Sequence, residues 1–186
     1  MKIKFDPNQD FQLDAIRSIV DVFKGQETCQ TNFTVTTARE DQMRLDYAAG
    51  NDLGIGNRLK MLSEDILANV NQVQLHNGLA QSESLESMDF TVDMETGTGK
   101  TYVYLRSIFE LNRQYGFTKF IIVVPSVAIK EGVYKSLQIT EDHFAIHYDN
   151  VQCDYFVYNS QKLGQVRNFA TSDYIQIMVI NIDAFR

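Results

Sequence analysis

Residues 94–101 read METGTGKT, and this stretch decides the fold. Before it, Phe90, Val92 and Met94 alternate with polar residues, which predicts a β-strand. After it, residues 100–115 carry a helical pattern that ends before a glycine. Glycines between a strand and a helix let the chain curl so that several backbone N–H groups point at one anion. The stretch therefore predicts a phosphate-binding loop, against the simpler alternative of an ordinary strand–turn–helix corner.

Each residue of this loop has an expected role in holding a nucleotide. The backbone N–H groups surround the phosphates, Lys100 reaches the β- and γ-phosphates as a point charge, and Thr101 gives its hydroxyl to Mg²⁺. The expected nucleotide-binding residues of the loop are Thr96, Gly97, Thr98, Gly99, Lys100 and Thr101. The longer P-loop pattern has Gly where this chain has Met94. The shorter xxGxGKT form tolerates that change and is typical of helicase-like ATPases.

The rest of the chain predicts strands that alternate with helices. Helices are expected over 9–24, 57–76 and 126–138, and strands over 32–37, 154–158 and 174–182. The run KFIIVV at 119–124 is apolar nearly throughout, as in a parallel strand covered on both faces. This alternation indicates an α/β fold with a mostly parallel sheet.

Two further segments resemble superfamily 2 helicases and translocases. FQLDAI at residues 11–16, upstream of the GTGKT loop, is similar to that group's YQxxAI pattern with Phe11 in place of Tyr. The resemblance implies that Gln12 reads the edge of adenine through two hydrogen bonds, so the expected cofactors are ATP and Mg²⁺. VVPSVAIKEG at 123–132 looks like the next motif, which touches the nucleic-acid backbone. Ser126 and Lys130 are the candidate DNA-binding residues, against the alternative of a helix cap and a surface lysine.

The finer resemblance is to restriction subunits of type III, and less closely type I, restriction–modification enzymes. It is carried by FQLDAIRSIVDVFKGQ (11–26), METGTGKTYVYLRSIFELNRQYGFTKFIIVVPSVAIKEGV (94–133) and IQIMVINIDAF (175–185). It implies a RecA-like P-loop NTPase lobe, ATP hydrolysis coupled to movement along double-stranded DNA, and cleavage by a distant nuclease domain. The implied partners are double-stranded DNA and a modification methyltransferase subunit. A general superfamily 2 DNA or RNA helicase and a non-catalytic nucleotide-binding assembly module remain alternatives.

One motif of the resembled family is missing from this chain. That family has a strand ending in Asp-Glu, which holds Mg²⁺ and activates the attacking water, and no Asp-Glu dipeptide occurs in the 186 residues. Asp183 ends an apolar strand, but Ala184 follows it, so it is a minor candidate for the Mg²⁺ residue. We therefore expect an N-terminal fragment of a longer subunit. It would bind nucleotide but hold no catalytic residue for hydrolysis or DNA cleavage.

Along the chain we expect three parts. Residues 1–25 hold the helix with Gln12, residues 26–88 form an insertion of unknown role that contains a helix, and residues 89–186 form the truncated core of the lobe. His143 and His147 have the spacing of a metal-binding HExxH motif, but Phe144 replaces its Glu. Surface or partly buried histidines are therefore expected there, and no metal site.

Composition and charge exclude several other classes of protein. The net charge of −7 argues against a basic module that binds nucleic acid by bulk charge. The longest apolar runs, at 121–124 and 177–180, are far shorter than the ~20 residues of a membrane span. The start of the chain has no apolar stretch of the signal-peptide kind, and Cys29 and Cys153 form no CxxC pair. A reducing cytoplasm is the expected location.

Overall fold

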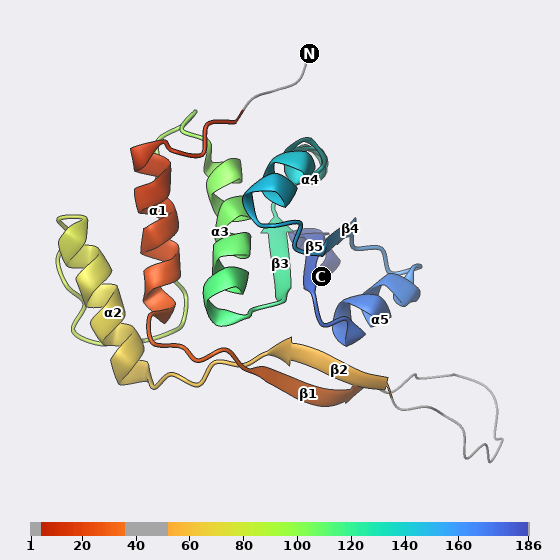
Figure 1. The fold of residues 1–186 in the computed structure, drawn as a ribbon, viewed down its shortest axis with the longest axis horizontal. Helices are drawn as coiled ribbons and strands as arrows, with labels where there is room; N and C mark the ends of the chain where they lie inside the picture. The colour runs from red at the N-terminus through yellow and green to blue at the C-terminus, as the bar shows by residue number, and fades with distance from the viewer. Residues whose placement is uncertain (1–4, 36–51, 186) are drawn as a thin grey trace. The chain divides into compact units, whose positions relative to one another are not determined.

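The computed structural model describes residues 5–35 and 52–185 (Figure 1). Its elements in chain order are α1 (Asp10–Val20), the 3-10 helix η1 (Asp21–Phe23), β1 (Gln30–Val35), β2 (Asp52–Asn57), α2 (Ser63–His76), α3 (Lys100–Tyr115), β3 (Lys119–Val124), α4 (Val127–His147), β4 (Cys153–Val157), α5 (Leu163–Thr171), β5 (Ile175–Asn181) and the 3-10 helix η2 (Ile182–Phe185). From α3 onward helices and strands alternate, which confirms the α/β class expected from the sequence.

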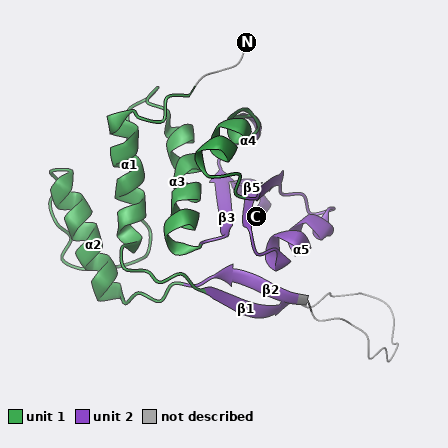
Figure 2. Cartoon of the chain, viewed as in Figure 1, with its two compact units in different colours: residues 1–29, 59–116, 135–151 green, residues 30–58, 117–134, 152–186 purple. Residues whose placement is uncertain are grey.

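The chain divides into two compact units, which Figure 2 colours separately. Unit 1 consists of residues 1–29, 59–116 and 135–151, and unit 2 consists of residues 30–58, 117–134 and 152–186. The units interleave along the chain, whereas the three parts expected from the sequence are consecutive, and that division stays a prediction.

Unit 1 is built from helices around an apolar core. Helix α1 buries Ile16 and Val20, which lie one turn apart on the face that their spacing predicts. The core side chains of α3 include Val103, Leu105, Ile108 and Phe109. On the other side of α1, helix α2 packs Ile66 and Val70 against Val22 of η1. Figure 1 shows α1 lying between α2 and α3, so the start of α3 is supported by a helical scaffold.

The main sheet of unit 2 is parallel, with strand order β3-β5-β4. Its central strand β5 is buried at every residue from Ile175 to Ile180, as expected of a parallel strand with neighbours on both sides. The register pairs Gln176 with Lys119 of β3 and Ile175 with Cys153 of β4. A parallel sheet joined by helices agrees with the RecA-like lobe that the sequence led us to expect.

Unit 2 also contains the antiparallel hairpin β1–β2. The strand predicted at 32–37 is observed as β1 at Gln30–Val35, and residues 36 and 37 lie outside the described residues. Strand β2 was not predicted, because glycines are depleted in strands and its middle reads LGIG. The ring of Phe33 on β1 lies where a Cβ at Gly54 would stand, so a side chain at Gly54 would displace that ring.

The strand predicted just before the glycine loop is not formed. Residues 89–95 have no regular structure, and Phe90 and Val92 are 38% and 44% exposed. A strand needs a neighbour to satisfy its backbone N–H and C=O groups. No strand within residues 5–35 and 52–185 pairs with this segment. The alternation of apolar and polar residues therefore gave a wrong prediction here.

Strand β3 has the predicted bounds but lacks the predicted cover on both faces. Ile121 and Val123, which point to the same face of the strand, are 52% and 49% exposed, so that face of β3 is open to solvent. Among the described strands β3 pairs with β5 alone. Helix α4 runs beyond the predicted end at residue 138, to His147. Helix α5 was not predicted, and it buries none of its residues.

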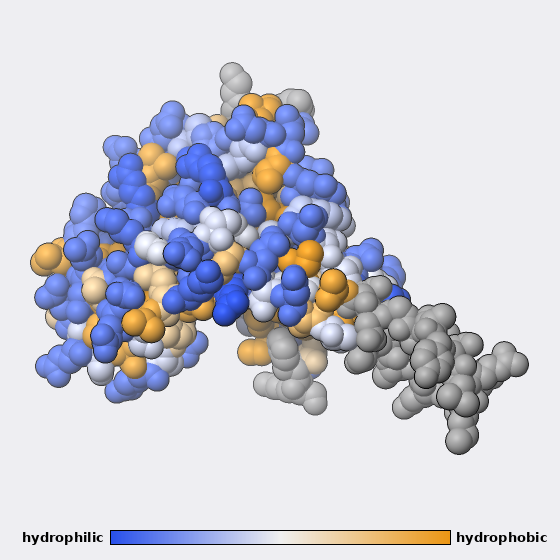
Figure 3. All heavy atoms as spheres, turned by 60° about the horizontal axis from the view of Figure 1, so that its bottom comes forward, coloured by the Kyte–Doolittle hydropathy of each residue, from blue (hydrophilic) through white to orange (hydrophobic). Residues whose placement is uncertain are grey.

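The face of the molecule drawn in Figure 3 is largely hydrophilic, with hydrophobic residues in small groups between. Exposed apolar side chains in small numbers are ordinary for globular proteins. Within the described ranges, none of the helices combines the length and the apolar character that crossing a membrane requires.

Candidate functional site

The glycine loop leads directly into α3 in unit 1. Gly97 and Gly99 have φ angles of 86° and 87°, in the left-handed region that residues with a Cβ rarely adopt. The hydroxyl of Thr98 donates a hydrogen bond of 2.7 Å to the carbonyl of Glu95, which closes the turn. The side chain of Glu95 is exposed to solvent. The backbone angles thus explain why glycine stands at both positions of the loop.

The first turn of α3 carries backbone N–H groups with no side-chain cap. Its N-cap is Gly99, and the α-helical hydrogen bonds begin with the Val103 N–H to Gly99 carbonyl bond of 3.0 Å. The N–H groups of Lys100, Thr101 and Tyr102 precede that bond and face the end of the helix. Together with the positive end of the helix dipole, they form a place where an anion is stabilised.

Gln12 lies against the same loop although it is 86 residues away in sequence. Its side chain is 8% exposed, and its Nε2 donates a hydrogen bond of 2.9 Å to the Thr98 carbonyl. A Cβ added to Gly99 would lie 2.6 Å from that same Nε2. The fold therefore brings together the two sequence motifs that were expected to hold the nucleotide, with glycine giving the amide room.

The remaining predicted residues of the loop differ in exposure. Lys100 is exposed, and no carboxylate in the described ranges pairs with it. Thr101 is half-buried, and Thr96 is exposed. Burial raises the pKa of the Tyr104 phenol, while a hydrogen bond with the side chain of Thr101 opposes that rise. The cation of Lys100 is thus available to a ligand.

A buried polar network on α3 was missed by the sequence analysis. Arg106 and Glu110 are each 6% exposed and lie one turn apart. The guanidinium of Arg106 donates to the Pro7 carbonyl at 2.6 Å, to His147 Nε2 at 3.0 Å and to the Tyr148 hydroxyl at 3.3 Å. The Tyr148 hydroxyl in turn donates to Glu110 Oε1 at 2.7 Å. The only sequence signal was a pair of opposite charges, four residues apart, on the apolar face of a helix.

The carboxylate of Glu110 in this network has a cationic partner inside unit 1. Arg113 NH2 lies 2.6 Å from Glu110 Oε2, so the buried carboxylate has a cation as well as the Tyr148 hydroxyl. Burial lowers the pKa of Arg106, whereas its interactions with Tyr148 and Tyr102 raise it, and the net direction is upward. The guanidinium therefore stays a charged donor in its buried position.

The two histidines that share a face of α4 belong to the same region of unit 1. His143 Nε2 lies 2.9 Å from the Tyr102 hydroxyl, and the two imidazole rings stack with centroids 6.1 Å apart. Burial lowers the pKa of both rings, and the charge of Arg106 lowers each pKa further. Because Arg106 can only donate, Nε2 of His147 must accept its hydrogen bond, which requires the neutral ring. No cluster of metal-ligating side chains occurs within the part of the chain that the structure describes.

The candidate DNA-binding residues lie in unit 2, at the start of α4. Ser126 precedes the helix, and its hydroxyl accepts a hydrogen bond of 3.3 Å from the backbone N–H of Ile129. This is the helix-cap role that was the simpler alternative for Ser126. Lys130 is half-buried, and its backbone N–H bonds the Ser126 carbonyl at 3.0 Å. Contact of these residues with DNA stays a prediction.

Asp183 lies in unit 2, in the short helix η2 that follows β5. Its backbone N–H donates to Asn181 Oδ1 at 3.2 Å, and its carboxylate is exposed to solvent. The strand end that precedes Asp183 thus matches the sequence expectation, and its role as a Mg²⁺ residue stays a prediction.

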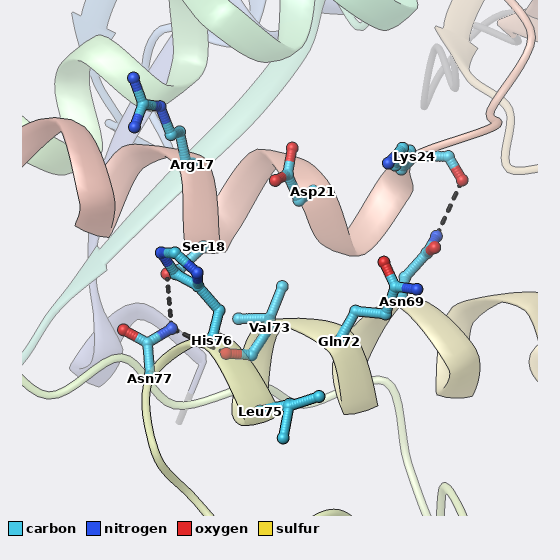
Figure 4. A pocket seen from close by; sticks show the side chains of 10 residues that line it. All are labelled: Arg17, Ser18, Asp21, Lys24, Asn69, Gln72, Val73, Leu75, His76 and Asn77. Carbon is cyan, nitrogen blue, oxygen red and sulfur yellow. Dashed lines mark hydrogen bonds between the residues drawn. The ribbon is translucent and has the colours of Figure 1, made fainter.

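A separate pocket of about 520 Å³ lies between α1 and α2 in unit 1 (Figure 4). Its polar groups bond mainly to the protein itself, since Asn69 Nδ2 donates to the carbonyl of Lys24 and Asn77 Nδ2 to the hydroxyl of Ser18. Arg17 and Asp21 on its wall carry opposite charges. The pocket therefore favours neither an anionic nor a cationic ligand. None of the glycine-loop residues lines it.

A parallel α/β sheet, together with a GTGKT loop that opens a helix, defines a RecA-like protein of the helicase-like class. The chain belongs to the family described as "Type III restriction enzyme, res subunit", whose sequence model matches residues 59–186. The resemblance drawn from the motifs is thereby confirmed.

Individual relatives agree with this family. The Res subunit of the type III enzyme EcoP15I from Escherichia coli is 34% identical over 142 residues, which is 66% of this chain and 15% of the relative. That of EcoPI from Escherichia phage P1 is 28% identical over 95% of this chain and 19% of its own length. That of StyLTI from Salmonella typhimurium is 40% identical over 86 residues, 45% of this chain and 9% of the relative. The chain thus spans less than a fifth of the length of these relatives.

Proposed function

We propose that this chain supplies the ATP-binding part of a Res subunit that moves along double-stranded DNA. The contact between Gln12 Nε2 and the Thr98 carbonyl, at 2.9 Å, carries the proposal because it brings a side-chain amide to the edge of the glycine loop. A side-chain amide offers one acceptor and two donors, which suits the donor and acceptor on the edge of adenine. Membership of the Res family supports the same reading.

The residues of the site fit a nucleoside triphosphate with Mg²⁺. Two left-handed glycines and an uncapped helix start provide backbone N–H groups for phosphate oxygens, and exposed Lys100 adds a cation. The Thr101 hydroxyl is a hard oxygen ligand of the kind Mg²⁺ prefers. The metal ion supplies charge neutralisation to the phosphates when it is bound. Gln12 would then select the base, while the loop holds the phosphates.

We further propose that the 186-residue chain binds ATP without turning it over efficiently. It has no Asp-Glu pair to hold Mg²⁺ and to activate water, and Asp183 is followed by Ala184. Hydrolysis, movement and DNA cleavage would belong to the whole subunit together with its modification methyltransferase and double-stranded DNA. Ser126 and Lys130 would be this chain's contribution to DNA contact. A steady-state ATPase rate of several turnovers per second from this chain would contradict the proposal.

The proposal is tested with Lys100→Ala and a matched surface variant, Lys162→Ala. Loss of a charge-assisted contact to phosphate should weaken ATP binding about 10- to 100-fold. The Lys162 variant should bind ATP as the unchanged chain does, because that lysine lies in unit 2, outside the loop. Titration with a fluorescent ATP analogue measures both constants. Equal affinities of the unchanged chain and Lys100→Ala would refute the site.

A further inference from the structure

The segment before α1 and the first turn of α1 contact α3 and the glycine loop at three places, all within unit 1. The ring of Phe5 stacks on Tyr102 with centroids 5.8 Å apart and planes 12° apart. The Pro7 carbonyl accepts the 2.6 Å hydrogen bond from Arg106 NH1. Gln12 Nε2 donates to the Thr98 carbonyl. Together these contacts hold the start of the chain against the glycine loop and α3.

Arg106 makes one of the two hydrogen bonds among these three contacts. It lies six residues after Lys100, which corresponds to about 9 Å along the helix axis. The backbone between its partner Pro7 and Gln12 is short and ordered, since Asn8 N–H bonds Asp6 Oδ1 at 3.0 Å and Gln12 N–H bonds the Gln9 carbonyl at 3.0 Å. A displacement of Pro7 would therefore move the first turn of α1, and Gln12 with it.

The guanidinium itself is held in place from its other side. Tyr148 and His147 accept from two of its other nitrogens, and the Tyr148 hydroxyl is tied to Glu110. The planar fork of Arg can bond three acceptors in different directions, which the single ammonium of Lys cannot reproduce. Buried polar networks that are fully satisfied are rigid. Arg106 is thus a fixed donor aimed at the backbone just before α1.

We propose that Arg106 is a positioning residue that fixes the turn before α1 and thereby holds Gln12 in the place from which it selects adenine. The proposal rests on the function proposed above. Arg106 does not touch the nucleotide in this assignment and acts through the Pro7 carbonyl. Loss of the Arg106 side chain should let the first turn of α1 move. The Gln12 amide would then adopt the orientation that binds adenine for a smaller fraction of the time. The affinity of the loop for phosphate would remain, because the backbone N–H groups and Lys100 bind the phosphates.

The test compares Arg106→Met with Lys135→Met in the 186-residue chain. Lys135 is exposed on the part of α4 that belongs to unit 1, and it contributes to none of the hydrogen bonds described above for Arg106, His147, Tyr148 and Glu110. In Arg106→Met the Glu110 carboxylate keeps Arg113 as its cation, so no buried charge is left unpaired. Pro7→Gly loosens the same link from the other side by freeing the backbone, and it leaves the network of Arg106 intact.

The first measurement needs no nucleotide. Hydrogen exchange of the backbone N–H groups of Gln12 and Leu13, both bonded to the Gln9 carbonyl, reports opening of the first turn of α1. We expect exchange at least about 10-fold faster in Arg106→Met, which corresponds to one lost hydrogen bond, and unchanged exchange in Lys135→Met. Unchanged exchange in Arg106→Met would overturn the anchoring. Should that variant fail to fold, the same measurement on Pro7→Gly decides, with unchanged exchange again overturning the proposal.

The second measurement is the ratio of the dissociation constants for GTP and ATP. Arg106→Met should lower the ratio about 5- to 10-fold, as Gln12→Ala does, while the affinity for inorganic tripolyphosphate stays constant. Combining Gln12→Ala with Arg106→Met should lower the ratio no further, because both act through one amide. If the ratio in the double variant falls below the ratio in Gln12→Ala, Arg106 acts independently of the Gln12 amide. That result would assign Arg106 a merely structural role and overturn the proposal.

The two proposals fail in different ways. If the unchanged chain binds ATP no better than GTP, or Gln12→Ala keeps the preference, the adenine role of Gln12 in the proposed function is wrong. If Gln12→Ala loses the preference and Arg106→Met keeps it, the proposed function stands and the role of Arg106 is wrong.

Discussion

At the scale of single residues, Gly99 has two reasons to be glycine. Its φ of 87° disfavours any residue with a Cβ, and a Cβ there would also lie 2.6 Å from Gln12 Nε2. Gly97 has nearly the same φ, 86°, but its Cβ would meet nothing within 4 Å. Substitution of Gly97 therefore measures the free-energy cost of backbone strain alone. Substitution of Gly99 adds the cost of displacing Gln12.

We predict that Gly99→Ala destabilises the chain more than Gly97→Ala does. Both substitutions incur the left-handed penalty of about 1–2 kcal/mol, and Gly99→Ala additionally breaks the Gln12 to Thr98 hydrogen bond, worth about 1 kcal/mol. Urea unfolding at fixed pH measures the difference. In a Gln12→Ala background the two glycine variants should become equal. Equal losses of stability in the unchanged background would show that Gln12 does not pack on Gly99 in solution.

The residues of the site were predictable to different degrees. The glycines and Gln12 were named from the sequence because each stands within a short pattern whose chemistry is local or whose family resemblance is specific. Arg106 was not named, since its partners come from residue 7 and from residues 147 and 148. Periodicity marks a buried helix face, but it does not say which distant polar groups meet a charge placed there.

At the scale of elements, α3 and β3 have the bounds that their sequences predict, because each is a continuous apolar or amphipathic run with a glycine or proline at its end. The segment 90–94 has an equally clear alternation and remains irregular. A helix satisfies its backbone hydrogen bonds internally, whereas a strand depends on a neighbour. Strand predictions therefore fail where the neighbour is not provided.

The contact between α3 and the end of α4 makes stability depend on pH. The pKa of His147 is lowered by burial, then by Arg106 and Arg113, with Glu110 opposing, and that of His143 by burial, His147 and Arg106. In the unfolded chain both pKa values return to about 6.5, so the unfolded state binds more protons as the pH falls. We predict full stability above about pH 7 and a decrease as the pH falls through 6.5 toward the folded pKa values.

Urea unfolding between about pH 7.5 and 5.5 checks this prediction. The variant His143→Gln/His147→Gln should lose this part of the pH dependence, while the contribution of exposed carboxylates stays in both proteins. Glutamine keeps an acceptor for Arg106 without a titrating ring. If both proteins show the same slope, the two rings do not differ in pKa between the folded and unfolded states.

At the scale of the whole molecule, the net charge of −7 limits how the chain can hold DNA. Binding through bulk charge releases many counterions, and the affinity then falls steeply with salt. Contact through Ser126 and Lys130 neutralises about one phosphate, since Ser126 carries no charge. The acidic balance is thus compatible with a few local contacts to the backbone.

We predict that any binding of double-stranded DNA by this chain has a shallow salt dependence. Each neutralised phosphate adds about 0.9 to the slope of log K against log salt. Lys130→Ala should reduce that slope by about this amount, and Lys135→Ala, on the same helix, should leave it unchanged. Fluorescence anisotropy of a labelled duplex at several salt concentrations measures the slopes. A slope typical of six or more phosphates, unaffected by Lys130→Ala, would exclude Lys130 as the contact.

The sequence by itself determined the class of the protein and its Res family, because the GTGKT loop, the FQLDAI helix and the apolar strands are local patterns that need no distant partner to be read. The tertiary structure alone decided that Gln12 lies on Gly99 and that Arg106 donates a hydrogen bond to the Pro7 carbonyl before α1. It also decided that β5 and not β3 is the covered strand. These features depend on which surfaces meet across long stretches of chain. Packing and buried hydrogen bonds select those meetings, and sequence spacing does not encode them.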